Sequence, residues 1–230
     1  MGPQPARVVA PGDSVYQLPE KGEVRVGSGI HQDGQHLITC RPGLLSTTQS
    51  GKVWVAGRQK RYIPQVGDCV LGRIADKHSE NYGVDINTPF PASLPVLAFE
   101  GATRRSRPNL QVGDLVYARV TAADRDVDPE LVCTDASGKA AGFGAMTGGQ
   151  AFRCTTSFAA KLLSQPTPAI LTALGRALQF ELAVGLNGHI WVHSPKPTTT
   201  IIVTNTLPKG EFLSDAQAEM VVKRIVSTMQ

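Results

Sequence analysis

The fold of the C-terminal third of this chain is decided by the stretch Gly185-Leu186-Asn187-Gly188-His189-Ile190-Trp191-Val192. An Asn-Gly pair between two alternating apolar runs is a strong local signal for a tight β-hairpin. The flanking runs, residues 180–184 and 189–193, alternate as strands do. We therefore expect two antiparallel strands joined by a turn at Asn187-Gly188.

Helices are predicted on both sides of this hairpin. Upstream, a strand at 151–155 is followed by a helix with Ser157 as its expected N-cap, and a second helix begins at Thr167-Pro168. Downstream, Ser214 and Gln217 have capping-box spacing. The helix after them places Ala218, Val221, Val222, Ile225 and Met229 on one stripe. The order strand, helix, helix, strand, strand, helix is that of a type I KH domain.

The central region, residues 58–142, has about five short strands with glycine-rich connections. Tyr82, Val84 and Ile86 alternate along the second strand, and the third is expected near residues 94–99. This pattern suits a closed barrel of the OB type, although periodicity alone fits a sandwich fragment nearly as well. Because Tyr82 shares its face with apolar residues, we interpret it as a core residue rather than a stacking platform for a base.

A turn with the sequence Gly-Asp recurs three times, as Pro11-Gly12-Asp13, Val66-Gly67-Asp68 and Val112-Gly113-Asp114. Glycine supplies the positive φ of a sharp turn, and the Asp side chain can accept from nearby backbone N–H groups. An alternating strand follows each turn, which indicates consecutive small β modules. The first module, within residues 8–57, is expected to be a small β domain of about fifty residues, marginal on its own.

Composition narrows the class of protein without deciding it. The chain has 230 residues, of which 41% are hydrophobic and 18% charged, as in ordinary globular domains. No apolar run approaches the ~20 residues of a membrane helix, and residues 1–10 lack a secretory signal core. The net charge of +4 permits nucleic-acid binding but requires a local basic patch.

The sequence predicts neither a cofactor nor a metal site. Its four cysteines, Cys40, Cys69, Cys133 and Cys154, lack zinc-ligand spacing and are expected to be reduced and buried. The acidic segment 124–128 resembles the start of an EF-hand loop, but Pro129 stands where glycine is required, so we interpret it as a polar hairpin loop. No nucleophile or metalloprotease motif is present, which favours a protein that is not an enzyme.

Three segments carry a resemblance to a known family. Residues 59–68 (QKRYIPQVGD) resemble the beginning of the S1-like domain of exosome cap proteins. Residues 99–117 (FEGATRRSRPNLQVGDLVY) and the 185–192 stretch look like the cap subunit family called ribosomal-RNA-processing protein 40. The resemblance covers nearly the whole chain and implies three domains: 1–57, an N-terminal β domain; 58–143, an S1-like OB-fold barrel; and 144–230, a KH domain. The fold class is thus mainly β plus α+β.

Function follows from the resemblance as an expectation. Such subunits sit on one face of a ring of RNase PH-like subunits beside other cap subunits, help hold the ring together and line the RNA path, while separate subunits degrade the RNA. With no targeting or membrane signal visible, we expect a nuclear, nucleolar and cytoplasmic protein with no membrane partner. The alternatives are a free-standing S1/KH protein of translation or ribosome biogenesis, and a nuclease in its own right.

Arginine density marks the best candidate for contact with single-stranded RNA. Arg104, Arg105 and Arg107 fall in a loop between two predicted barrel strands, and guanidinium groups bind phosphate bidentately. A solvated loop or an anchor for a partner subunit is the competing interpretation. Lys77 and His78, in the first barrel connection, are weaker candidates for the same face. Binding of this kind follows the backbone and is salt-sensitive.

The KH domain departs from the RNA-binding pattern. Its expected helix connection, residues 164–168 (SQPTP), contains no glycine, whereas RNA-binding KH domains clamp the backbone with a GXXG loop there. We therefore interpret Gly185, Asn187, Gly188 and Trp191 as a structural hairpin and not as an RNA clamp.

Overall fold

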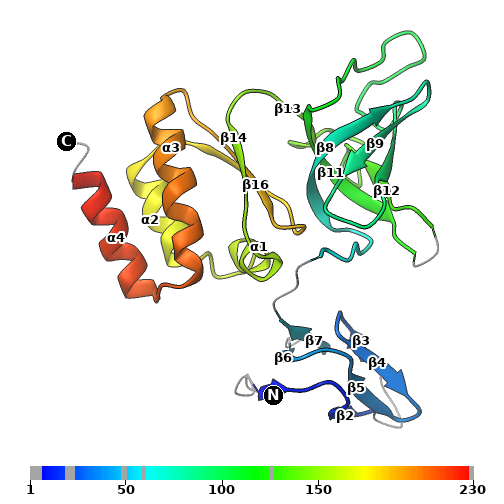
Figure 1. Cartoon of the computed structure of the whole chain (residues 1–230), viewed down its shortest axis with the longest axis vertical. Coiled ribbons are helices and arrows are strands. Elements are labelled where there is room, and N and C mark those ends of the chain that lie inside the picture. The colour runs from blue at the N-terminus through cyan, green and yellow to red at the C-terminus, as the bar shows by residue number, and fades with distance from the viewer. Residues whose placement is uncertain (1–6, 19–23, 48–50, 58–60, 125–126, 228–230) are drawn as a thin grey trace. The chain divides into compact units, whose positions relative to one another are not determined.

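A computed structural model describes the chain apart from residues 1–6, 19–23, 48–50, 58–60, 125–126 and 228–230 (Figure 1). The chain forms two compact units, Met1–Gln59 and Lys60–Gln230. In the described part of the chain, no helix is long and apolar enough to cross a membrane.

The N-terminal unit consists of two small sheets, with strand orders β1-β6-β7-β3 and β2-β5-β4. Their strands are β1 (Arg7–Val9), β2 (Ser14–Gln17), β3 (Arg25–Val26), β4 (Ile30–Asp33), β5 (His36–Thr39), β6 (Gly43–Thr47) and β7 (Lys52–Ala56). Five buried side chains form the core: Val9, Ile30, Leu37, Val53 and Val55. All the elements among the described residues of this unit are strands, as the glycine-broken runs predicted.

The three Gly-Asp turns have one geometry. Gly12, Gly67 and Gly113 all have positive φ, between 92° and 102°. In each turn the aspartate N–H donates to the carbonyl three residues earlier, at 3.1 Å. Since a side chain at such a φ is strained, glycine is the residue that this turn requires. The predicted repeat is confirmed as a repeated local structure.

The second unit begins with a closed barrel. Its sheet contains β8 (Cys69–Lys77), β9 (Asn81–Asp85), β10 (Ala92–Pro95), β11 (Leu115–Ala122), β12 (Glu130–Val132) and β13 (Gly144–Met146). The order is β12-β10-β9-β8-β11-β13, and β12 also pairs with β11, which closes five strands into a barrel. Alternate residues of β11 are buried in the barrel core. The OB-type barrel is confirmed over the sandwich alternative.

Two features of the barrel differ from expectation. The third strand ends at Pro95, where a turn follows with Ala98 N–H donating to Pro95 O at 3.0 Å. Phe99 pairs with Cys133 through one isolated bridge only. In addition β13, beyond the expected domain boundary at 144, pairs with β11 and belongs to the barrel sheet.

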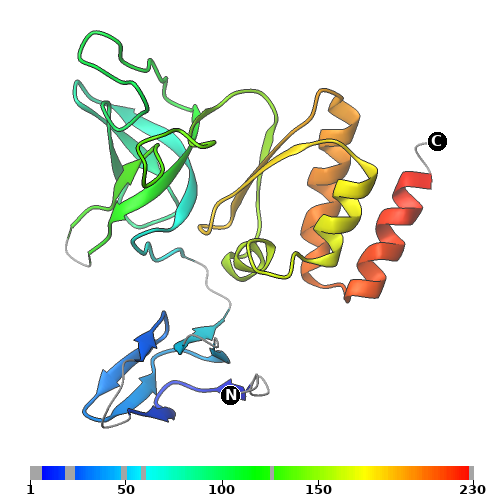
Figure 2. The same ribbon diagram turned by 180° about the vertical axis from the view of Figure 1, so that it is seen from behind.

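The C-terminal domain has the type I KH arrangement. Its antiparallel sheet has the order β14-β16-β15, and Figures 1 and 2 show α2, α3 and α4 on one side of it. The elements are β14 (Gln150–Arg153), α1 (Thr156–Leu162), α2 (Ala169–Ala177), β15 (Glu181–Val184), β16 (His189–His193), α3 (Pro197–Thr206), the 3-10 helix η1 (Leu207–Glu211) and α4 (Asp215–Ser227). The S1-like barrel and KH domain are therefore confirmed.

Helix ends show where local signals succeeded and failed. The capping box is confirmed, since Ser214 N–H donates to Gln217 Oε1 at 3.0 Å. The N-cap of α1 is Thr155 and not Ser157, because the Thr155 hydroxyl accepts from Phe158 N–H at 3.1 Å. Helix α3, which lies between β16 and the helix after Ser214, was not predicted. The domain therefore has one more helix after the hairpin than the predicted order contains. Met229 of the stripe predicted for the helix after Ser214 lies outside the described residues.

The expectation of buried cysteines is wrong in part. All four thiols are free, but Cys40 is exposed and Cys69 and Cys154 are half-buried. Cys133 lies in the barrel core, where burial raises the pKa of its thiol to about 12. Cys40 stands directly after the end of β5 and is exposed, although His31 Nδ1 of β4 lies 3.2 Å from its sulfur.

Candidate nucleic-acid interface

The arginine-rich loop connects β10 to β11 at one end of the barrel. Arg104, Arg105 and Arg107 are all exposed. The loop is ordered by its own turn, in which Thr103 N–H donates to Ser106 O and Ser106 N–H donates to Thr103 Oγ1, both at 3.0 Å. The three guanidinium groups therefore project from a defined backbone.

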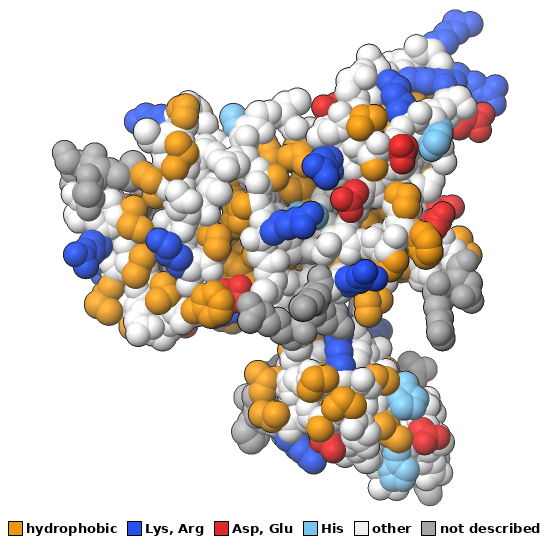
Figure 3. Space-filling view, in the orientation of Figure 1, with side chains coloured by type: hydrophobic (Ala, Val, Ile, Leu, Met, Phe, Trp, Pro, Cys, Tyr) orange, Lys and Arg blue, Asp and Glu red, His pale blue; other side chains and the backbone are white. Residues whose placement is uncertain are grey.

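The same loop is tied to the hairpin between β8 and β9. Arg107 Nη1 donates to Ser79 O at 3.0 Å, and Lys77 Nζ donates to Asn109 Oδ1 at 2.7 Å. These bonds bring two segments that are well separated in sequence side by side. We call Lys77, His78, Arg104, Arg105 and Arg107 the basic patch. Figure 3 shows blue side chains gathered over this end of the barrel.

The three arginines of the basic patch differ in the hydrogen bonds that they make within the protein. Arg107 is committed to the loop, because its Nε also donates to Arg104 O at 3.1 Å. The side chains of Arg104 and Arg105 have no hydrogen bond or ion pair with any residue that the structure describes. Arg107 thus positions the loop, and Arg104 and Arg105 are the groups available to a phosphate.

Tyr82 supports the patch from beneath. Its ring is buried in the barrel core, which confirms the interpretation as a core residue. Its hydroxyl donates to Pro108 O at 2.6 Å and so holds the end of the arginine loop. The basic patch itself contains no Phe, Tyr or Trp side chain. Contact with nucleic acid at this patch would therefore involve phosphates more than bases.

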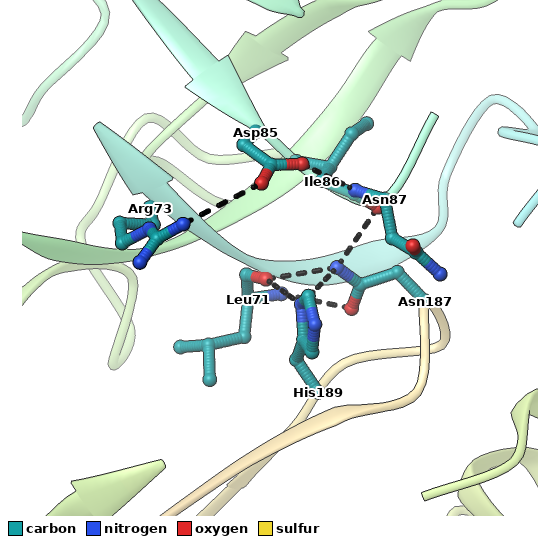
Figure 4. Close-up of polar contacts among 7 residues, drawn as sticks. All are labelled: Leu71, Arg73, Asp85, Ile86, Asn87, Asn187 and His189. Atoms are coloured by element: carbon teal, nitrogen blue, oxygen red, sulfur yellow. Dashed lines mark hydrogen bonds and ion pairs between the residues drawn. The ribbon is translucent and has the colours of Figure 1, made fainter. Parts of the chain in front are cut away.

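The hairpin at Asn187 lies at the junction of the barrel and the KH domain (Figure 4). The Asn187 amide is buried and reaches across to the barrel: Nδ2 donates to Leu71 O at 2.8 Å and to Ile86 O at 3.2 Å, and Oδ1 accepts from Leu71 N–H at 3.3 Å. Strand β9 pairs with β8 only from Arg73 onward, whereas β11 pairs with β8 at Leu71 as well. Asn187 thus occupies the place of the strand partner that β8 lacks at Leu71 on its β9 side.

Glycine is required on both sides of this asparagine. A Cβ at Gly185 would lie 2.5 Å from Leu71 N, and one at Gly188 would lie 2.6 Å from Cys154 O. Both contacts are with backbone, which cannot rotate away. The sequence of the hairpin is therefore set by its close approach to two neighbouring strands.

Trp191 packs on the apolar side of the junction. It forms a cluster with Leu71 of the barrel and Ala183 of β15, and its Nε1 donates to Gly148 O at 2.9 Å. Tyr117 of β11 donates to Val184 O at 3.2 Å. Burial raises the pKa of Tyr117 far above the ordinary value, so the phenol stays protonated and can donate. The two domains are joined by both apolar and polar contacts.

The connection between α1 and α2 offers no phosphate clamp. Ser164 to Thr167 are exposed, and the connection contains no glycine. Prolines at 166 and 168 also remove two backbone donors. The GXXG geometry that lets a phosphate approach the backbone is therefore missing from this KH domain.

A second charged group, which the sequence reasoning missed, lies beside the hairpin. His189 of β16 pairs in register with Arg153 of β14, and Arg73 of β8 pairs with Asp85 of β9. A small cavity of about 150 Å³ is lined by residues of both domains, including these four. The alternation along each strand predicts that these side chains point outward. No local sequence pattern predicts that the barrel sheet and the KH sheet bring them together.

An S1-type barrel packed against a KH domain defines a class of RNA-binding proteins, and comparisons with known proteins identify the family within that class. The S1 domain model of exosome complex component RRP40 matches residues 62–144, and a KH domain model matches residues 149–198. Exosome complex component rrp40 of Schizosaccharomyces pombe is 38% identical over 217 residues, 92% of this chain and 90% of that protein.

More distant proteins agree with this match. Exosome complex component RRP40 of Homo sapiens is 36% identical over 209 residues, 88% of this chain and 76% of that protein. A crystal structure assigned to an exosome complex RNA-binding protein, 22% identical, has the same fold, with a TM-score of 0.62 over 74% of this chain and 100% of that chain. The chain belongs to the exosome complex component RRP40 family.

Proposed function

We propose that this protein is a non-catalytic RNA-binding cap subunit of an RNA exosome. In this role it binds RNase PH-like ring subunits and other cap subunits, stabilises the ring and guides single-stranded RNA toward the channel for 3'–5' degradation and processing. Separate nuclease subunits perform the degradation. Membership of the RRP40 family supports the assembly, and the S1/KH architecture supports the RNA contact. We extend the proposal to a nuclear, nucleolar and cytoplasmic location.

The basic patch is the observation that carries the RNA-binding part. Five basic or titratable side chains from two loops lie together, and Arg104 and Arg105 have no partner among the described residues. Positive groups gathered on one surface attract the phosphate backbone whatever the base sequence. The proposed contact is therefore weakly selective for sequence, which suits a protein that passes many RNAs.

Arg104→Gln combined with Arg105→Gln is expected to weaken binding of a labelled single-stranded RNA about five- to tenfold at 0.1 M salt, since two charge-assisted phosphate contacts are lost. The slope of log K against log salt should become shallower by about 1.4, because each single-strand phosphate contact contributes about 0.7. Fluorescence anisotropy over a salt series measures both quantities.

Arg176→Gln with Lys223→Gln is the matched control. These side chains lie on α2 and α4, far along the chain from the basic patch, and the double change removes the same two charges. It should leave the salt slope unchanged. Equal weakening by both double variants would show that net charge, and not the basic patch, carries the binding.

A further inference from the structure

The junction between the barrel and the KH domain contains a charged cleft on the face shown in Figure 3. Its cavity, about 150 Å³, is lined from the barrel by β8 and β9 and from the KH domain by β14 and β16. We call it the junction cleft, and its polar lining residues are Arg73, Asp85, Arg153 and His189. In Figure 3 blue and red side chains gather at the centre of the molecule where the two domains meet.

Two guanidinium groups enter the junction cleft from opposite domains. Arg73 is mostly exposed and its Nη2 lies 4.0 Å from Asp85 Oδ2, a contact that holds it weakly. Asp85 is also engaged by the Asn87 N–H, which donates to its Oδ1 at 2.9 Å. Arg153 is exposed opposite His189. Both arginines are therefore free to turn toward an anion in the cleft.

His189 is held in one orientation by the junction. Its Nδ1 lies 3.2 Å from Leu71 O, and also 3.2 Å from Asn187 Nδ2 (Figure 4). Both hydrogens of Asn187 Nδ2 are already directed to the carbonyls of Leu71 and Ile86. The proton of the ring is therefore assigned to Nδ1, which donates to Leu71 O.

This tautomer leaves His189 Nε2 as an acceptor. Burial lowers the pKa of the imidazole, and the positive charges of Arg153 and Arg73 lower it further against the opposing effects of the Leu71 bond and Asp85. The ring is then neutral at neutral pH and Nε2 carries a lone pair. Among the residues that the structure describes, none hydrogen-bonds this atom.

We propose that the junction cleft binds one ribonucleotide of an RNA chain, with Arg73 and Arg153 on the phosphate and His189 Nε2 accepting from the ribose 2'-hydroxyl. The 2'-hydroxyl is the group that distinguishes RNA from DNA, and phosphate and hydroxyl are neighbours in the same nucleotide. The basic patch attracts either nucleic acid through its charge, whereas the junction cleft selects RNA. This inference rests on the proposed RNA-binding function.

His189→Asn tests the acceptor with little disturbance of the junction. The asparagine amide can place a donor near the position of Nδ1 and keep the bond to Leu71 O, but it offers nothing at the position of Nε2. Anisotropy with one labelled RNA and the DNA of the same sequence, at the same salt, measures the preference for RNA. The variant should lose about three- to tenfold of that preference through weaker RNA binding, with DNA binding unchanged.

Arg153→Gln tests the phosphate contact without touching a buried group. It should weaken RNA and DNA binding equally, about two- to fourfold, and should leave the preference for RNA unchanged. Thermal unfolding of both variants checks that the domains remain joined. Arg176→Gln again serves as the control for loss of one charge.

The outcomes separate this inference from the proposed function. Full-length protein that binds RNA, but with equal affinity for DNA, overturns the junction cleft and leaves the cap-subunit proposal standing. So does a His189→Asn variant that keeps the full preference. Protein that binds neither nucleic acid overturns the proposed RNA-binding function and the junction cleft with it.

Discussion

Gly188→Glu is expected to lower the free energy of unfolding by roughly 3–5 kcal/mol, enough to unfold much of the protein at physiological temperature. Gly188 is buried with φ of 81°, and its Cβ position lies 2.6 Å from Cys154 O. Cys154 N–H also donates to Gly188 O at 2.8 Å, so the two backbones cannot separate without losing a bond. A glutamate there adds a buried carboxylate to the backbone strain.

Gly138→Glu is the matched control for this variant. Gly138 has nearly the same φ, 80°, but nothing lies within 4 Å of its Cβ position. It should cost only the backbone strain, about 1 kcal/mol. Urea denaturation of both variants, followed by circular dichroism, gives the comparison. If Gly188→Glu unfolds like Gly138→Glu and loses RNA binding instead, then the hairpin contacts RNA and its structural interpretation is wrong.

Asn187→Leu is expected to cost roughly 3–4 kcal/mol of stability, although leucine has almost the same size. The change removes three hydrogen bonds between the domains. It leaves the Leu71 N–H and the Ile86 O without this partner, whereas the Leu71 O keeps the bond from His189 Nδ1. Each buried backbone group left unsatisfied costs about 1–3 kcal/mol. Differential scanning calorimetry measures the loss, and the barrel and KH domain should then unfold less cooperatively.

Asn205→Leu provides the comparison for Asn187→Leu. Asn205 is an exposed residue on α3, and its replacement should change stability by no more than about 0.5 kcal/mol. Equal effects of the two substitutions would mean that the Asn187 bonds contribute nothing to the junction. A stability loss at Asn187 without any change in cooperativity would show that contacts other than the Asn187 bonds couple the two domains.

Local patterns predicted the elements that depend on neighbours in sequence. The hairpin at Asn187-Gly188, the capping box at Ser214 and the repeated Gly-Asp turns all involve hydrogen bonds that span only a few residues, so the local sequence predicts them. The alternation of β11 likewise follows from one buried face. The fold class was therefore accessible from sequence.

Helix α3 shows the opposite case. Its sequence, PTTTIIVTNT, is rich in β-branched residues, which lose side-chain freedom in a helix and favour strands. The helix forms because Thr199, Thr200, Val203 and Thr206 are buried against the rest of the KH domain. Tertiary packing overrides propensity here, and no short window of sequence contains that information.

Each candidate site also has a part that the local sequence predicts and a part that depends on distant contacts. Arginine density marked the loop at Arg104 to Arg107, but the bond from Arg107 to Ser79, which joins two loops, depends on barrel closure. The role of Asn187 depends on Leu71, 116 residues away in sequence. The hairpin motif predicts a turn, whereas its function as a substitute strand partner appears only when two domains are seen together.

Affinity purification of the tagged protein from its native cells, with mass spectrometry of the co-eluting proteins, tests the central claim most directly. We predict recovery of RNase PH-like ring subunits and other cap subunits in near-stoichiometric amounts. Recovery of the protein alone, or with ribosomes, would contradict the cap-subunit function and favour a free-standing S1/KH protein.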